Sequence, residues 1–498
     1  MEEVLRSLAK FGPELALTAG LLLVVLVDAF RPPARDTINK LITVASLAVA
    51  LVLCVDLSSP AAAAEIFSGM VLVDPLGTFF KVILLAAALL LVLSFTFRNS
   101  RELWGIGQGE FYTLLLAVTL SNLLLASAND LAMLYLALEM VSIGSYVMVA
   151  YMKGDRMSNE ASLKYVLFGA VSTGTMVYGL SLLYGLAGTT SIPGIHDFLT
   201  MGLTDDNRLT VYIVALLVFA GFGFKTAAVP FHFWCPDVYQ GAPTPVTAFL
   251  SVAPKAAGFA VMLRFFYGGF SLQGAHEWDL TGAIDWPHLL MAVSVLTMTV
   301  GNVAALTQTN MKRLLAYSSI AHAGYIMMGV VALSENGARA LLIYLLAYVF
   351  MNLGAFLVVT LVHHHDDTFD LRDYPGLYRR APLLTVAMAV FVLSLVGIPP
   401  LVGFMGKLYV FAAIIEQGYG WYAMAGAINA AIAAYYYFRI LKTMVVEDEV
   451  GPPRPQMQLA FADRAWLIFI VAANVLPLLF WSAIEGWARA SAVLYAAR

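Results

Sequence analysis

Ionisable side chains lie inside apolar runs of this 498-residue chain. The densest group is in the stretch from Gly221 to Lys255, which holds Lys225, His232 and five prolines. A lysine at mid-bilayer depth costs roughly 2.5–3.5 kcal/mol on insertion scales, and a proline within a span frees backbone carbonyls that then need a neighbouring group or water. Both features fit a hydrated cavity inside a membrane protein. Because a desolvated lysine can release a proton near neutral pH and an arginine cannot, the stretch predicts a proton path with buried lysines as titrating groups.

Three further charged residues extend this row. Glu139 lies in the middle of the apolar segment LYLALEMVSIG and needs a cationic partner, for which Lys164 or Lys225 is the candidate. Lys164 is about one turn inside its own run, so an alternative is that its ammonium group extends to the aqueous phase. Lys407 follows a double proline, and we expect it to stand in the second half of the chain roughly where Lys225 stands in the first.

Two histidines are weaker candidates. His232 and His322 each lie between lysines of the row and could relay a proton, but a lone histidine in a span is also often a satisfied core residue. Both interpretations stay open. The tract His363-His364-His365-Asp366-Asp367 resembles a metal-binding segment, yet it stands among aspartates and arginines, and we expect a solvated loop.

Other polar residues are expected to have structural roles. Lys81 and Arg264 should extend to the outer membrane face. The membrane carboxylates that should mark span ends are Asp28, Asp56, Asp74 and Asp130. The triple tyrosine at 435–437 is typical of an interfacial aromatic belt.

Composition sets the class of protein. Hydrophobic residues make up 61% of the chain and charged residues 12%, whereas soluble domains carry about 25% charged residues. The chain is therefore expected to be an all-α polytopic membrane protein. Basic arms for nucleic acid are absent. Cys54 and Cys235 are too few for an iron–sulfur cluster, and no nucleotide-binding glycine motif occurs, so we expect no flavin, nucleotide or metal site in this chain.

Apolar runs long enough to span a bilayer predict fourteen spans. The run at 382–416 should be two half-helices because glycine and proline break it in the middle. The first run precedes Asp28 and Arg31 rather than a small-residue cleavage site, so it is interpreted as a span. The runs are 13–30, 38–57, 76–97, 111–128, 130–151, 160–187, 209–233, 242–268, 286–307, 313–334, 337–363, 382–416, 420–443 and 463–488.

Lysine and arginine concentrate in the odd-numbered connections between these runs. Because cytoplasmic connections carry the excess of basic residues, we expect the odd connections in the cytoplasm and both termini outside.

An internal repeat is visible within a single membrane domain, 1–498. The segments LALEMVSIGSYVMV (136–149) and LAYSSIAHAGYIMM (315–328) align without gaps. Extending the match predicts a first repeat at 111–268 and a second at 286–443, flanked by helices in 1–110 and 444–498. Five spans per repeat would invert the second copy in the membrane, which is typical of transporters.

The segment FKTAAVPFHFWCPDVYQGAPTPVTAFLSVAPKAAGFA resembles the signature of the antiporter-like membrane subunits of proton-pumping NADH:quinone oxidoreductase, respiratory complex I. The resemblance implies fourteen core helices, with spans 4–8 and 9–13 related by inversion and spans 7 and 12 broken. It also implies a hetero-oligomer in the bacterial inner membrane, with neighbouring antiporter-like and small membrane subunits as partners. FMN, iron–sulfur clusters, NADH and quinone would be bound by partner subunits.

The resemblance also implies roles for individual residues. Glu139 matches the glutamate that pairs with a span-7 lysine, here Lys225. Lys255 matches the central span-8 lysine, and Lys407 the span-12 residue that controls exchange with one side of the membrane. Lys164 matches a lysine on span 6. His232 and His322 match polar positions on the central axis.

The expected function is proton translocation coupled to quinone reduction in other subunits. Half-channels at the two broken helices would admit and release the proton. An alternative is a cation/proton antiporter subunit of a multi-subunit Na⁺/H⁺ antiporter or a hydrogenase-type complex, and another is an arm subunit that carries no protons. A chain that ends soon after the fourteenth span differs from the largest antiporter-like subunit of the family, which carries extra C-terminal spans. Lysine at 407 differs from the glutamate usual in the middle one, so we expect a third member of the family.

Overall fold

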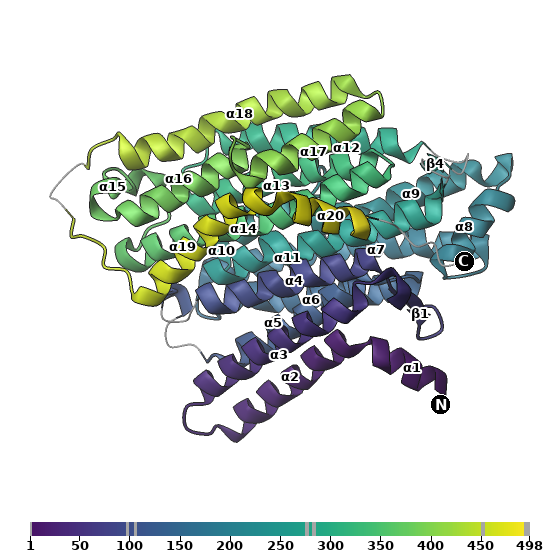
Figure 1. Ribbon diagram of the computed structural model, residues 1–498, viewed down its shortest axis with the longest axis horizontal. Helices are drawn as coiled ribbons and strands as arrows, with labels where there is room; N and C mark the ends of the chain where they lie inside the picture. Colours follow the sequence, from purple (N-terminus) through teal and green to yellow (C-terminus); the bar gives the residue numbers. More distant parts are fainter. Residues whose placement is uncertain are drawn as a thin grey trace.

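Long helices run side by side through the whole molecule (Figure 1). The computed structural model describes residues 2–95, 99–103, 107–273, 278–280, 285–449 and 454–492. Within these residues, twelve helices are long and apolar enough to cross a membrane. The two remaining predicted runs correspond to a broken pair, α16 (Pro382–Val396) and α17 (Val402–Glu416), and to α18 (Gly420–Val445). Every predicted apolar run thus coincides with a helix or a helix pair, and the chain is a polytopic all-α membrane protein.

The other long helices begin within a few residues of the predicted runs, and the last run, 463–488, is divided among α19, η5 (Leu476–Phe480) and α20 (Trp481–Ser491). They are α2 (Gly12–Phe30), α3 (Arg35–Leu57), α4 (Pro75–Ser94), α5 (Gly109–Ala126), α6 (Leu131–Val149), α7 (Arg156–Ala187), α9 (Asp205–Thr226), α11 (Thr244–Leu263), α12 (Trp286–Ala305), α13 (Met311–Val331), α14 (Glu335–Asp366) and α19 (Phe461–Val475).

Short elements lie at the helix ends. Two antiparallel strand pairs join β1 to β2 and β3 to β4, with Ala64 opposite Val73 and Ser271 opposite Leu280. The short elements are α1 (Glu2–Lys10), η1 (Pro60–Ala62), β1 (Ala64–Ile66), β2 (Val71–Val73), η2 (Arg101–Leu103), α8 (Ile192–Met201), α10 (Trp234–Gly241), η3 (Arg264–Gly269), β3 (Ser271–Gln273), β4 (Trp278–Leu280), η4 (Leu371–Asp373), α15 (Leu377–Arg380), η5 (Leu476–Phe480) and α20 (Trp481–Ser491).

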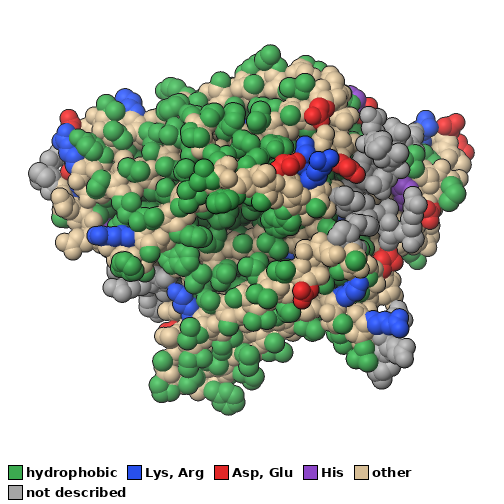
Figure 2. Space-filling view, in the orientation of Figure 1, with side chains coloured by type: hydrophobic (Ala, Val, Ile, Leu, Met, Phe, Trp, Pro, Cys, Tyr) green, Lys and Arg blue, Asp and Glu red, His purple; other side chains and the backbone are tan. Residues whose placement is uncertain are grey.

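Charged side chains lie mainly toward the two ends of the long helices. Figure 2 shows charged side chains gathered mainly toward the left and right edges of the molecule, with a largely hydrophobic band between them. The connection between α2 and α3 and the one between α18 and α19 both lie at the left in Figure 1, whereas α1, α8 and β4 lie at the right. We call the left end, where the α2–α3 connection with Arg31 and α15 (Leu377–Arg380) with Arg380 lie, the basic side. These odd-numbered connections thus lie at one end of the helices, and α1, α8 and β4 lie at the other, as the predicted spans require.

The core is built on α11, α13 and α14. Every residue of α11 is buried, as are most residues of α13 and α14. Helices α2, α3, α19 and α20 lie at the periphery and expose apolar side chains, as lipid-facing helices do. The residues of the predicted lysine row are therefore on or beside the most enclosed helices of the molecule.

Both predicted helix breaks are present. α9 ends at Thr226, and Ala227 takes a left-handed conformation before α10 begins at Trp234. α16 ends at Val396, where Gly397 has φ +90°, a conformation that favours glycine. The expected equivalence of the two break lysines is wrong, because Lys225 lies on the half-helix before its break and Lys407 on the half-helix after its break.

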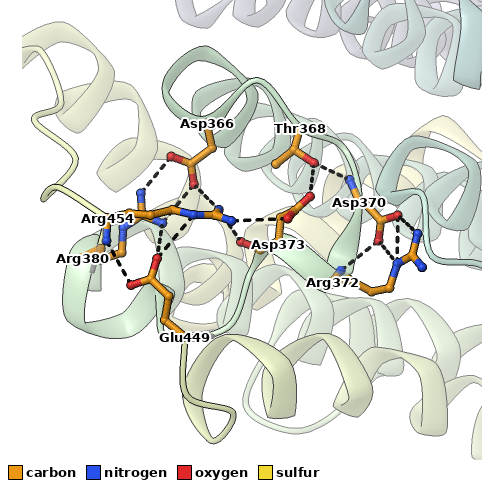
Figure 3. Close-up of polar contacts among 8 residues, drawn as sticks. All are labelled: Asp366, Thr368, Asp370, Arg372, Asp373, Arg380, Glu449 and Arg454. Carbon is orange, nitrogen blue, oxygen red and sulfur yellow. Dashed lines mark hydrogen bonds and ion pairs between the residues drawn. The ribbon is translucent and has the colours of Figure 1, made fainter. Parts of the chain in front are cut away.

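An ion-pair network secures the basic side of the second broken helix (Figure 3). Arg380 on α15 donates two hydrogen bonds to Asp366 at 2.8 and 3.0 Å. Arg454 contacts Asp366, Asp373 and Glu449. The expectation of a loop at 363–367 is therefore wrong for residues 363–366, which end α14. The Asp366 side chain is 8% exposed and pairs with Arg380 and Arg454, whereas His365 and Asp367 are exposed.

Two buried ion pairs hold the first turns of α4. Lys81 Nζ lies 2.7 Å from Glu14 Oε1 on α2, and both side chains are at most 1% exposed. Arg264 donates to both oxygens of Asp74 and to the Ala126 carbonyl oxygen. Lys81 and Arg264 therefore do not extend to the membrane face as expected, since a carboxylate on a neighbouring element meets each of them inside the protein.

The Glu14–Lys81 pair gives a stability prediction. Lys81→Met leaves the Glu14 carboxylate buried without its cation, which typically destabilises by about 3–5 kcal/mol. The double variant Glu14→Gln with Lys81→Met removes both charges and should recover most of this loss. The measurement is the thermal unfolding midpoint of the detergent-solubilised protein. Equal midpoints for the single and double variants would contradict a charge-pair origin.

Candidate proton path

Helix α13 carries the centre of the site. Ser319, His322 and Tyr325 repeat every three residues and therefore lie along one face of this helix. All three side chains are buried. Lysines from α11 and α17 reach this face at its two ends.

Lys255 on α11 reaches the Ser319 end. Its Nζ donates to Ser319 Oγ at 2.6 Å and lies 5.7 Å from the centre of the Tyr239 ring. The side chain is 3% exposed. The lysine follows Pro254, the proline inside α11. A buried ammonium is thus held by one hydroxyl and one aromatic face, with no carboxylate bonded to it in the described parts of the chain.

His322 lies at the middle of the α13 face. Its Nδ1 is 3.0 Å from Tyr344 Oη, and its Nε2 is 3.3 Å from Tyr437 Oη. Tyr437 also hydrogen-bonds Ser318. The expected interfacial belt at 435–437 is therefore wrong for Tyr436 and Tyr437, which are buried, whereas Tyr435 is exposed.

Lys407 on α17 reaches the Tyr325 end. Its Nζ donates to the carbonyl oxygens of Leu395 and Val396 at 3.1 and 2.7 Å and lies 4.7 Å from the Tyr325 ring centre. These carbonyls end the half-helix α16, where the helix dipole is negative and the last carbonyls lack helical partners. The break in the helix is thus what supplies the partners of this lysine.

Lys225 on α9 does not pair with Glu139 as expected. Its Nζ donates to Ser142 Oγ at 3.0 Å, and no ion pair within 4.0 Å involves Glu139 among the described residues. Glu139 is half-buried on α6, one turn before Ser142. The stem of Lys225 packs against Gly258 of α11, one turn from Lys255.

Lys164 on α7 belongs to a second group near the basic side. Its Nζ lies 2.7 Å from Asp237 and 2.9 Å from Glu160, and its side chain is 38% exposed. Asp237 on α10 also bonds Arg313 of α13. Sequence reasoning missed Asp237, although a carboxylate within the broken-helix segment WCPDVYQG was a usable signal.

His232 lies in the turn between α9 and α10. Its ring packs on Phe233, and its Nδ1 is buried without a protein partner. No hydrogen bond or ion pair joins it to a lysine in the part of the chain that the structure describes.

The structure therefore places Lys255, Ser319, His322, Tyr325 and Lys407 in one row along α13. Lys255 bonds Ser319 at one end, the rings of His322 and Tyr325 lie 5.9 Å apart, and Lys407 lies over the Tyr325 ring at the other end. Lys225 approaches this row through Gly258, while Glu139 and His232 stay outside it. Hydroxyl and imidazole groups both accept and donate protons, so the row can pass a proton between lysines. Within the described residues, no three His, Cys, Asp or Glu side chains come together as a metal site.

Gly258 gives a prediction about the contact between the two lysines. A Cβ at this position would lie 3.1 Å from Thr226 Cγ2 and 3.3 Å from Lys225 Cγ. Gly258→Ala should displace Lys225 by a few tenths of an ångström and lower the rate of proton translocation. The loss should be smaller than the roughly 10²-fold that a misplacement of about 1 Å can cost. Gly185→Ala, where a Cβ meets nothing within 4 Å, is the matched control. Equal translocation rates would show that this contact does not set the transfer rate.

Comparison with known proteins shows the family to which this chain belongs. Residues 128–433 match the family described as "NADH:quinone oxidoreductase/Mrp antiporter, TM". This segment contains every residue of the row. The chain belongs to this family of proton-antiporter-like membrane subunits.

Its curated relatives are subunits N of NADH-quinone oxidoreductase. Subunit N 2 of Chloroherpeton thalassium is 42% identical over 97% of this chain and 94% of its own length. Subunit N of an Anaeromyxobacter species is 42% identical over 99% of this chain and 98% of its own length.

Solved structures share the fold. A chain in respiratory complex I from Thermus thermophilus superposes with a TM-score of 0.78 at 32% identity, covering 95% of this chain and 98% of that one. A chain of the Mrp complex from a Dietzia species has a TM-score of 0.82 at 18% identity over 98% and 97% of the two chains. The second likeness concerns the fold alone.

Proposed function

We propose that this chain is the subunit N-type, proton-translocating subunit of an NADH:quinone oxidoreductase membrane arm. The observation that carries the proposal is the buried row from Lys255 to Lys407, in which hydroxyl and imidazole groups along α13 lie between the two lysines. Relatives named as subunit N, similar over nearly the whole chain, support it. FMN, iron–sulfur clusters, NADH and quinone belong to partner subunits, and this chain moves protons only.

The transfer sequence follows from the geometry. Lys255 as an ammonium gives one proton to His322 through Ser319, and Lys255 becomes a neutral amine. The imidazole passes the proton onward past Tyr325 to Lys407, which must be a neutral amine to accept it. The break between α16 and α17 offers the exit, because the carbonyls that hold Lys407 stand at a helix end. The neutral amine of Lys255 must then regain a proton, at a place where Lys225 of α9 packs one turn away on Gly258.

Orientation and partners complete the proposal. Basic connections lie in the cytoplasm of bacteria, so the basic side faces the cytoplasm and both termini face outward in the inner membrane. Neighbouring antiporter-like and small membrane subunits cover the exposed face of α6, where Glu139 lies at span depth. The helices within 111–268 and 286–443 form the two inverted repeats, which is supported by one broken helix in each.

The alternative function is that of a Na⁺/H⁺ antiporter subunit. The fold is shared with a chain of the Mrp complex, and the lysine row by itself needs no electron donor. This alternative predicts sodium–proton exchange in vesicles without NADH.

The test is gentle purification of the tagged chain from its native membrane, with an untagged strain as control. The expected result is co-purification of flavin- and iron–sulfur-containing subunits with NADH:quinone reductase activity. Recovery of small hydrophobic partners alone, together with sodium–proton exchange in vesicles, would replace the proposal with the antiporter function.

A further inference from the structure

A polar cavity opens on the basic side, and its lining residues belong to neither of the two broken helices. Its volume is about 590 Å³, and charged residues of four different segments line it. They include Arg31, Arg35, Glu102, Glu110 and Lys153. Both cations and carboxylates line its wall, so the cavity suits water and protons rather than an apolar ligand.

Glu102 connects this cavity to the buried core. Its carboxylate lines the cavity, and its side chain is 9% exposed. Glu102 Oε2 accepts from the backbone N–H of Thr244 at 2.6 Å, and Oε1 lies 3.0 Å from Lys312 Nζ. Lys312 is 1% exposed and also donates to the Ala242 carbonyl oxygen at 2.6 Å. One ion pair thus closes the inner end of the cavity at the first turn of α11.

A stripe of hydroxyl groups continues inward from this ion pair. Thr244, Thr247, Ser251 and Lys255 are spaced by three or four residues, so they share one face of α11. The stripe covers about 16 Å of helix at 1.5 Å per residue. All four side chains are buried. Lys255 is therefore the inner end of a polar line that begins at the cavity.

Buried polar atoms without protein partners accompany the stripe. They are Thr244 Oγ1, Tyr239 Oη and Asn352 Oδ1. Tyr239 lies under Lys255, and the Asn352 side chain donates to Ser251 Oγ. Buried polar atoms are almost always satisfied by protein or by internal water. The line between Glu102 and Lys255 is thus chemically suited to a chain of water molecules.

We propose that the Glu102–Lys312 ion pair is the gate of a proton entrance that runs from the basic-side cavity along the hydroxyl stripe of α11 to Lys255. The inference rests on the proposed function and replaces the expectation that protons enter at the broken helix α9–α10. A hydronium ion in the cavity gives its proton to the hydrated stripe and becomes water. The neutral amine of Lys255 takes a proton at the other end and becomes an ammonium, so charge is conserved.

The gate is closed in this structure, since both carboxylate oxygens of Glu102 are engaged. Burial raises the pKa of the Glu102 carboxyl, but the Lys312 ammonium and the hydrogen bonds together outweigh it and hold that pKa below its ordinary value. The carboxylate is therefore charged at neutral pH, and the ion pair persists. Opening the gate therefore requires Lys312 or the segment 99–103 to move. Protonation of Glu102 at cytoplasmic pH does not open it.

The test compares variants in the assembled complex, reconstituted in vesicles. The stripe variant combines Thr247→Val with Ser251→Ala, which removes two hydroxyls and changes side-chain size little. We expect the ratio of the variant's rate of NADH-driven proton translocation to the wild-type rate to fall at least tenfold, on the order of the contribution of a proton-transfer group. Thr43→Val is the control, because Thr43 is equally buried but lies on α3 and bonds only its own helix.

A second variant tests the gate. Glu102→Gln retains the shape of the side chain and an acceptor for the Thr244 N–H but weakens the hold on Lys312. The expected result is a proton leak in resting vesicles, measured as faster collapse of an imposed pH gradient. Thr43→Val should not leak. Unchanged gradient decay in Glu102→Gln would overturn the role of the ion pair.

Lys255→Met in the same assay separates the two proposals. Loss of translocation in Lys255→Met with full translocation in the stripe variant would overturn the entrance and leave the function standing. Full translocation in both would overturn the proposed function itself. If the stripe variant fails to assemble, Thr247→Val alone serves as the test, judged by the same ratio.

Discussion

Replacing Lys255 with methionine is expected to stop proton translocation by the assembled complex. Methionine has a similar length and is apolar, so it fills the same space, but it can neither hold nor release a proton. Lys255 lies where the α11 stripe meets Ser319 and the α13 row. We expect at least a tenfold loss, on the scale of removing a proton-transfer group. The measurement is NADH-driven proton uptake in inverted membrane vesicles, normalised to the amount of this chain in the complex.

Lys255→Arg separates charge from proton transfer. Arginine keeps the positive charge beside Ser319 but does not deprotonate in proteins, so it should fail like methionine. Lys442→Arg is the matched control, because Lys442 is 64% exposed and pairs with Glu447 at the surface. Normal translocation by Lys255→Arg would show that this lysine does not release its proton, and the transfer sequence along α13 would then be wrong.

Gly403→Ala is expected to prevent correct packing of the second broken helix. A Cβ at Gly403 would lie 1.8 Å from the Ser394 carbonyl oxygen and 3.0 Å from Met351 Sδ. The first of these atoms is backbone, so α16 and α17 must separate. A loss on the order of 4 kcal/mol or more would place the variant among exceptional single substitutions. The amount of chain incorporated into purified complex, and the thermal midpoint of that complex, measure the effect.

Separation of the half-helices also removes the partners of Lys407. Its ammonium group is held by the carbonyl oxygens of Leu395 and Val396 at the end of α16. Gly174→Ala is the control, because a Cβ on this α7 residue meets nothing within 4 Å and alanine favours helix. Wild-type assembly and translocation by Gly403→Ala would mean that the close packing of the two half-helices is dispensable.

The helices and their breaks were predictable because their causes are local. An apolar run of span length must form a helix in a bilayer, since no water satisfies its backbone. Proline removes a helical donor, and glycine permits the left-handed turn at Gly397. These properties act within a few residues, so the breaks near Pro230 and Pro399 could be located from sequence. Asp74 and Asp130 were placed correctly at span ends for the same reason, and both accept N-cap hydrogen bonds.

The partners of charged residues were predicted poorly. Lys81 and Arg264 were expected to extend to the membrane face, but Glu14 and Asp74 meet them inside the protein. Sequence distance carries no information about such pairs: Asp74 and Arg264 are separated by 190 residues. Each pair depends on the rotation and depth of two helices, which packing sets.

The sequence by itself determined the class of protein, the spans and the two breaks, and it named candidate titrating residues. These follow from apolar length, from proline and glycine, and from lysine side chains that a bilayer does not tolerate without a function. Only the tertiary structure decided that Lys225 bonds Ser142 instead of Glu139, that Tyr437 reaches His322, and that Glu102 caps α11. The physical reason is that a hydrogen bond needs its atoms within about 3 Å, and only the packing of distant helices brings them that close.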